Sequence, residues 1–119
     1  MSKILVFMLF GPFILALGLI TKFFPPKKPN NLYGYRTTRS MKNQDVWEFA
    51  NDFSSKSFIA SGLGMTLVTL ICWNQSEENF VLINLVSLLV GLGLSIYMTE
   101  RQIKKYFDSE GNRKNLNQN

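Results

Sequence analysis

Three long stretches without a charged side chain constrain the fold of this sequence more than any other feature. They run from Ile4 to Ile20, from Phe58 to Trp73 and from Phe80 to Met98. As α-helices they would be roughly 24 to 29 Å long, which nearly matches the hydrocarbon core of a bilayer. A helix in a soluble bundle carries polar residues on one face, and these stretches have no charge on any face. The sequence therefore predicts an all-α membrane protein with three transmembrane helices, at about residues 4–22, 57–74 and 80–99.

The first stretch has an alternative interpretation as a cleaved signal peptide, with Lys3 supplying the positive charge that such peptides carry. No cleavage site of small residues follows it. Phe23 and Phe24 instead resemble an interfacial aromatic belt, followed by two lysines. We expect a retained helix, bent near Pro12 because proline cannot donate a backbone hydrogen bond.

Basic residues lie on one side of the predicted spans. Of the 13 lysines and arginines, only Lys3 precedes the first span, and the short link between the second and third spans contains Glu77 and Glu78 but no basic residue. The positive-inside rule then predicts a multi-pass protein of the cell membrane with its N-terminus outside and its C-terminus in the cytoplasm. The net charge of +5 favours the lipid bilayer as the partner of these cations, and no direct nucleic-acid binding is expected.

The residues needed for common catalytic sites are largely missing from this sequence. It contains no histidine and one cysteine, Cys72, so it lacks the commonest general base and any cysteine-cluster metal site. No Asp, Glu, Lys or Arg lies inside the three stretches, which argues against a proton or ion pathway. We expect no enzyme activity, no catalytic residue, no metal and no cofactor.

Small residues recur at helical spacing in the predicted spans. Ser87, Gly91 and Ser95 are four residues apart, and Ala60 and Gly64 form a similar pair. Small side chains let helices approach closely in lipid. We expect packing between the three helices, and an oligomer through the same kind of face is open.

The predicted inner loop, residues 23–56, is unusually rich in specific side chains. Its prolines exclude a helix at its start. Tyr33 and Tyr35 flank Gly34, which permits a positive φ, and both hydroxyls are expected at the lipid headgroups. Arg36 and Arg39 can bind phosphate or carboxylate oxygens: those of inner-leaflet lipids, of an acidic partner, or of Asp45 and Glu48 in the same segment. A loop of this kind can also be purely structural.

The second half of this loop has the pattern of an amphipathic helix. Asn43 suits an N-cap, with Asp45 favoured by the helix dipole in the first turn. Apolar residues then recur at helical spacing from Val46. We expect an interfacial helix that leads into the second span, with Trp47 as its membrane anchor. Asn51 lies four residues after Trp47, so the two are predicted to contact one substructure together.

The loop also carries a motif. The pattern N-x-Y-G-Y-R-T, followed by R-S-M-K-N and W-x-x-x-A-N, resembles the SdpI/YfhL family of small bacterial membrane proteins. Thr38 departs from it, because many relatives have proline there. The candidate motif or binding residues are Asn31, Tyr33, Gly34, Tyr35, Arg36, Thr37, Arg39, Ser40, Trp47 and Asn51. The resemblance implies one membrane domain over residues 1–107, and the polar residues 108–119 are expected to be a disordered cytoplasmic tail.

The resemblance also implies a function. The founding type of the family protects the producing cell against a secreted peptide that collapses membrane energisation, and it draws a DNA-binding repressor to the membrane. An integral membrane immunity protein that binds a bacteriocin-like toxin peptide is therefore the first expectation. The alternative is a signalling or scaffolding protein that holds a cytoplasmic regulator such as a transcriptional repressor. The larger immunity proteins of the family carry additional membrane segments before this domain.

Overall fold

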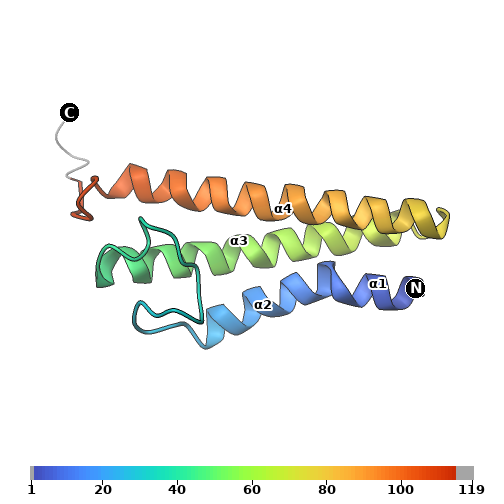
Figure 1. Cartoon of the computed structure of the whole chain (residues 1–119), viewed down its shortest axis with the longest axis horizontal. Coiled ribbons are helices and arrows are strands. Elements are labelled where there is room, and N and C mark those ends of the chain that lie inside the picture. The colour runs from blue at the N-terminus through green and yellow to red at the C-terminus, as the bar shows by residue number, and fades with distance from the viewer. Residues whose placement is uncertain (1, 115–119) are drawn as a thin grey trace.

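Three antiparallel rods of helix form the molecule (Figure 1). The computed structural model describes residues 2–114, and within this range the helices are α1 (Lys3–Leu9), α2 (Gly11–Phe23), α3 (Gln44–Ile71) and α4 (Glu77–Tyr106). The rod formed by α1 and α2 and the rods α3 and α4 are each long and apolar enough to cross a membrane. The predicted all-α membrane fold with three spans is confirmed.

Polar side chains and a proline set the helix boundaries. Ser2, Asn43 and Ser76 each accept a hydrogen bond from a backbone N–H of the first turn that they cap. The first rod is interrupted at Phe10, and Pro12 lies in the opening turn of α2. A proline is tolerated there because the first N–H groups of a helix have no partner within it. The predicted bend in the first span is confirmed.

Small residues bring the rods together. A methyl group added to Gly18 of α2 would lie 2.7 Å from the backbone nitrogen of Ile59, so α2 and α3 touch backbone to backbone at this point. Between α3 and α4, the hydroxyls of Ser61 and Ser95 lie 2.9 Å apart. Gly64, by contrast, has nothing within 4 Å of its added methyl and faces away from the bundle. The predicted packing between helices therefore uses only part of the small residues.

The predicted interfacial helix is the first half of α3, which continues without a break into the second span (Figure 1). The structure differs from the prediction in what covers its apolar face. Val46 and Ala50 form a core cluster with Ile103 and Phe107 at the end of α4, so α4 covers this face in place of lipid. Trp47 is fully buried, and the prediction that it anchors the protein in the membrane interface is wrong.

The polar segment after α4 is folded where the structure describes it. Gly111 adopts a φ of +86°, and its carbonyl accepts a hydrogen bond from the Asn43 side chain at 2.7 Å. Arg113 binds both carboxylate oxygens of Asp45, each at 2.8 Å. Residues 108–114 thus dock on the start of α3, in contrast to the disordered tail expected from their composition. The remainder of that predicted tail, residues 115–119, lies outside the described residues.

Candidate functional site at the basic end

The candidate residues gather at one end of the bundle. This basic end holds the connecting loop, residues 24–43, together with the start of α3 and the end of α4 (Figure 1). Trp47 donates a hydrogen bond from Nε1 to the carbonyl of Pro26 at 2.8 Å. One turn further along α3, Asn51 Oδ1 accepts from the backbone N–H of Tyr35 at 2.6 Å. Trp47 and Asn51 therefore clamp the connecting loop to α3, as their spacing predicted.

The clamp requires a glycine next to Tyr35. Gly34 has a φ of +108°, which L-residues with a side chain rarely adopt. A methyl group on it would lie 2.6 Å from both Asn51 Oδ1 and Pro26 Cγ. The positive φ and the lack of space for a side chain therefore both require glycine at position 34.

A side-chain turn then orders the basic residues. Ser40 is fully buried and its Oγ accepts from the backbone N–H of Thr37 at 2.7 Å. In return, Thr37 Oγ1 accepts from the backbone N–H of Ser40 at 3.1 Å. The Ser40 hydroxyl lies within donating distance of the Tyr35 carbonyl, at 3.0 Å. This reciprocal pairing fixes the backbone between Arg36 and Arg39.

Glu100, near the end of α4, receives two of the candidate side chains. The Tyr35 hydroxyl donates to its Oε1 at 3.1 Å, and Arg39 Nε lies 4.0 Å from its Oε2. That Oε2 is buried without a hydrogen-bond partner among the described residues. Burial and then the Glu100 carboxylate raise the pKa of Tyr35 above its ordinary range.

These contacts show which partners the loop side chains have within the chain. The Tyr35 hydroxyl binds Glu100, and the Tyr33 hydroxyl donates to the carbonyl of Phe24 at 2.5 Å. Their position at the lipid headgroups stays a prediction. The acidic residue beside Arg39 is Glu100, which is distant in sequence and was not predicted. The available signal was its position as the first charge after the third span, directly before Arg101.

The sequence motif also missed Asn30. Asn30 Oδ1 accepts hydrogen bonds from the backbone N–H groups of Leu32, at 2.9 Å, and Tyr33, at 2.7 Å. This is an Asx turn, the local geometry that Asn favours. Its neighbour Asn31, which belongs to the motif, is exposed.

Arg36 differs from the other charged side chains of the site. It is exposed, and no hydrogen bond or ion pair joins its guanidinium to another described residue. It lines a pocket of about 400 Å³ between the connecting loop and the three rods. Of the candidate residues, Tyr33, Gly34, Tyr35 and Thr37 share this pocket, whereas Asn31, Arg39, Ser40, Trp47 and Asn51 do not line it.

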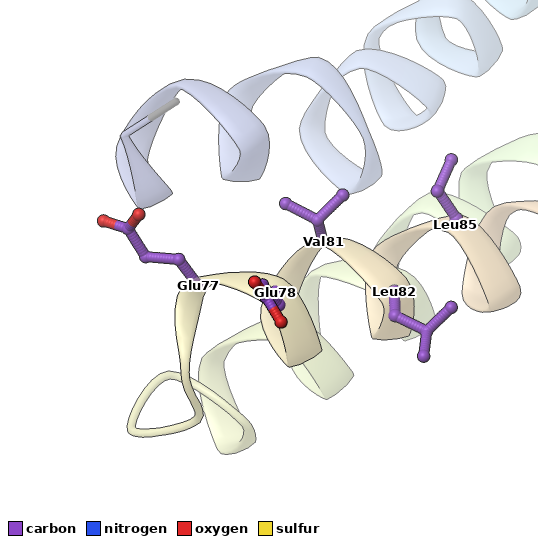
Figure 2. Close-up of a pocket in the computed structure, with 5 residues that line it drawn as sticks. All are labelled: Glu77, Glu78, Val81, Leu82 and Leu85. Atoms are coloured by element: carbon purple, nitrogen blue, oxygen red, sulfur yellow. The ribbon is translucent and has the colours of Figure 1, made fainter.

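The opposite, acidic end carries a second pocket. Lys3 Nζ donates to the carbonyls of Trp73, at 2.7 Å, and Gln75, at 2.6 Å, so it binds the link between α3 and α4. Glu77 and Glu78 remain exposed beside it. With apolar residues of α4 they line an open pocket of about 470 Å³. Figure 2 shows Glu77 and Val81 pointing toward α1.

No group of three potential metal ligands occurs among residues 2–114. The basic end presents hydrogen-bond donors and acceptors together with the exposed guanidinium of Arg36. The acidic end presents two carboxylates beside an apolar surface. Both are suited to binding.

The similarity to known proteins extends beyond the motif. Residues 27–98 match the model of a family described as the SdpI/YfhL protein family. The chain is also 34% identical, over 101 residues, to the uncharacterized protein YfhL of Bacillus subtilis strain 168. The aligned residues cover 85% of this chain and 88% of that protein. No solved structure matches. The family match includes every candidate residue of the basic end but stops short of Glu100.

Proposed function

This chain belongs to the SdpI/YfhL family, and on that premise we propose that it is a membrane immunity protein of the SdpI type. It would protect the cell that makes it against a secreted, membrane-active peptide by binding that peptide. The protein itself is a multi-pass membrane protein. We further propose that its acidic end faces outward and its basic end faces the cytoplasm, in agreement with the positive-inside rule.

The observation that carries this proposal within the structure is the pocket at the acidic end. Glu77 and Glu78 line this pocket together with Val81, Leu82 and Leu85 of the same helix. Carboxylates and an apolar surface are therefore combined on α4 (Figure 2). A membrane-active peptide with cationic and apolar residues would complement both parts. Lys3, the basic residue nearby, already binds two backbone carbonyls that follow α3. It would therefore compete little with such a peptide for the two carboxylates.

A signalling or scaffolding role is the second candidate, supported by the order at the basic end. The clamp from Trp47 and Asn51, and the docked segment 108–114, hold this end in one shape with Arg36 free. A rigid basic surface of this kind suits a cytoplasmic regulator such as a transcriptional repressor.

The experiment places this chain in toxin-sensitive cells that lack their own immunity genes, and measures survival against the killing peptide that the family's founding type resists. One variant carries Glu77→Gln and Glu78→Gln together. Its matched control is Glu110→Gln, which removes an exposed carboxylate at the other end. A third variant is Arg36→Ala, and the amount of each protein in the membrane is measured alongside.

Survival with the intact chain and with Glu110→Gln, and death with the double variant, would support immunity through the acidic end. Survival that depends on Arg36 and not on the two glutamates would indicate an inner partner. Death of cells that hold the intact chain in their membrane would rule out immunity to that peptide and leave the signalling role.

A further inference from the structure

The pocket at the basic end combines two kinds of surface in one space. Its floor is apolar: Leu17 of α2, Phe58 of α3 and Ile96 of α4, three residues from stretches that span the membrane. Its rim is the connecting loop from Leu32 to Thr37, and it carries a single charged side chain, that of Arg36. The pocket therefore runs from the hydrocarbon level of the bundle to a cation at its mouth.

The polar groups around the pocket are largely satisfied by the protein. Thr21 Oγ1 donates to the carbonyl of Leu17 at 2.9 Å, and Ser54 Oγ to that of Asn51 at 3.3 Å. The hydroxyls of Tyr33 and Tyr35 bind Phe24 and Glu100. The guanidinium of Arg36 is the charged group of this pocket, and no described residue forms a hydrogen bond or ion pair with it.

Three other basic side chains at this end have carboxylate partners in the chain. Arg39 lies beside Glu100, Arg113 binds Asp45 and Lys56 binds Asp52 at 3.0 Å. Arg36 differs from these three because it lines the pocket and the Ser40–Thr37 turn holds its backbone without giving its side chain a carboxylate. A guanidinium presents several donors in a planar fork that suits phosphate oxygens.

We infer that this pocket holds one anionic phospholipid, with its headgroup phosphate at Arg36 and an acyl chain against Leu17, Phe58 and Ile96. Charge complementarity selects the occupant, since the pocket offers one cation and no carboxylate lines it. A lipid without net charge carries its own cation beside the phosphate and gains less from Arg36. The apolar floor requires an acyl chain, which separates a lipid from free phosphate. The inference is independent of whether the protein confers immunity.

The test uses the whole chain, purified in a neutral detergent and stripped of lipid. Native mass spectrometry then measures how much phosphatidylglycerol and phosphatidylcholine it retains from an equal mixture. Arg36→Gln is compared with Lys42→Gln, which removes an exposed cation of the same end that does not line the pocket. Ile96→Trp, which fills the floor, is compared with Leu94→Trp, another exposed position on α4. Thermal unfolding without lipid confirms that each variant is folded.

The intact chain should prefer phosphatidylglycerol. Arg36→Gln should lower the affinity for that lipid about fivefold, because a cation near the membrane surface contributes about 1 kcal/mol, while Lys42→Gln leaves it within about twofold. Ile96→Trp should reduce retention of phosphatidylglycerol and Leu94→Trp should not. Equal retention of the two lipids, equal losses in the two cation variants, or displacement of the lipid by glycerol phosphate alone would each overturn the inference.

Discussion

Many polar side chains of this protein bind the backbone of a segment distant in sequence. Asn51 holds the N–H of Tyr35, Trp47 holds the carbonyl of Pro26, and Lys3 holds two carbonyls after α3. A backbone group buried without a partner costs free energy comparable to a lost hydrogen bond, so a loop packed against helices needs such donors and acceptors. Most of the motif therefore builds the loop, and Arg36 is the charged candidate that remains free for a ligand.

Gly34 is required in the loop both by its backbone conformation and by the space around it. Gly34→Ala should lower the free energy of unfolding by about 1–3 kcal/mol, because the alanine would be held in a sparsely populated backbone conformation and its methyl would press on Asn51 and Pro26. The measurement is denaturant unfolding in detergent micelles. Gly64→Ala is the control, since its added methyl meets nothing within 4 Å. Equal stability of the two variants would contradict the close contact at Gly34.

Tyr35 makes stability depend on pH in the alkaline range. Its folded-state pKa is raised by burial and by Glu100, whereas the unfolded value is about 10. The unfolded chain therefore loses its proton first as pH rises. The stabilisation is complete below about pH 10 and is lost as pH approaches the folded-state pKa.

Unfolding measured from about pH 9 to about pH 12 checks this expectation. The free energy of unfolding should fall with pH more steeply in the intact chain than in Tyr35→Phe, which has no phenol at this position. Glu100→Gln should give an intermediate slope, since it removes the carboxylate charge but leaves the burial. Identical slopes in the three proteins would show that the Tyr35 phenol is not coupled to folding.

At the scale of elements, α3 performs two tasks along one axis. Its second half is a membrane span of apolar residues, while its first half buries Trp47, Asn51, Ser54 and Ser55 beneath the connecting loop and the end of α4. Continuous helix pairs the backbone groups where the two parts join, since only the end turns of a helix lack intrahelical partners. The end of α4 covers the apolar face of the first half, so this half can extend the span without lying along the membrane surface.

Cross-linking checks this arrangement. In a Cys72→Ser background, cysteines at Ala50 and Ile103 should form a disulfide under mild oxidation, because these residues share one core cluster. Cysteines at Glu48 and Ile103 should not, since Glu48 is exposed on another side of α3. A first half of α3 that lay in the membrane plane would give no cross-link for either pair.

At the scale of the whole molecule, charge divides the 53 Å long bundle into two unlike ends. The acidic end holds Glu77 and Glu78, and the basic end holds the connecting loop and the end of α4. Translocating clustered lysines and arginines is unfavourable, which is the basis of the positive-inside rule. The predicted orientation follows from this asymmetry.

Thiol labelling in whole cells checks the orientation. In the Cys72→Ser background, Glu77→Cys should react with a membrane-impermeant maleimide in intact cells, and Lys42→Cys only after permeabilisation. Both positions are exposed, so access to the reagent decides the result. As a second arm, alkaline phosphatase fused after Lys114 should be inactive. The reverse pattern in both arms would show that the bundle has the opposite orientation in the membrane.

The sequence by itself determined the three spans, the helix start at Asn43, the bend near Pro12 and the pairing of Trp47 with Asn51. These depend on local quantities: run length, capping chemistry, the missing N–H of proline and the period of a helix. The family motif likewise lies in the loop that Trp47 and Asn51 hold against α3.

Only the tertiary structure decided what those residues contact. Glu100 receives Tyr35 and Arg39 from more than 60 positions away in the chain, and Arg113 crosses a similar gap to Asp45. Composition alone suggested a disordered tail and an interfacial Trp47, because it records polarity and not which neighbour satisfies a polar group or covers an apolar face. Those partners exist only once the helices pack and bring distant segments to the same end of the bundle.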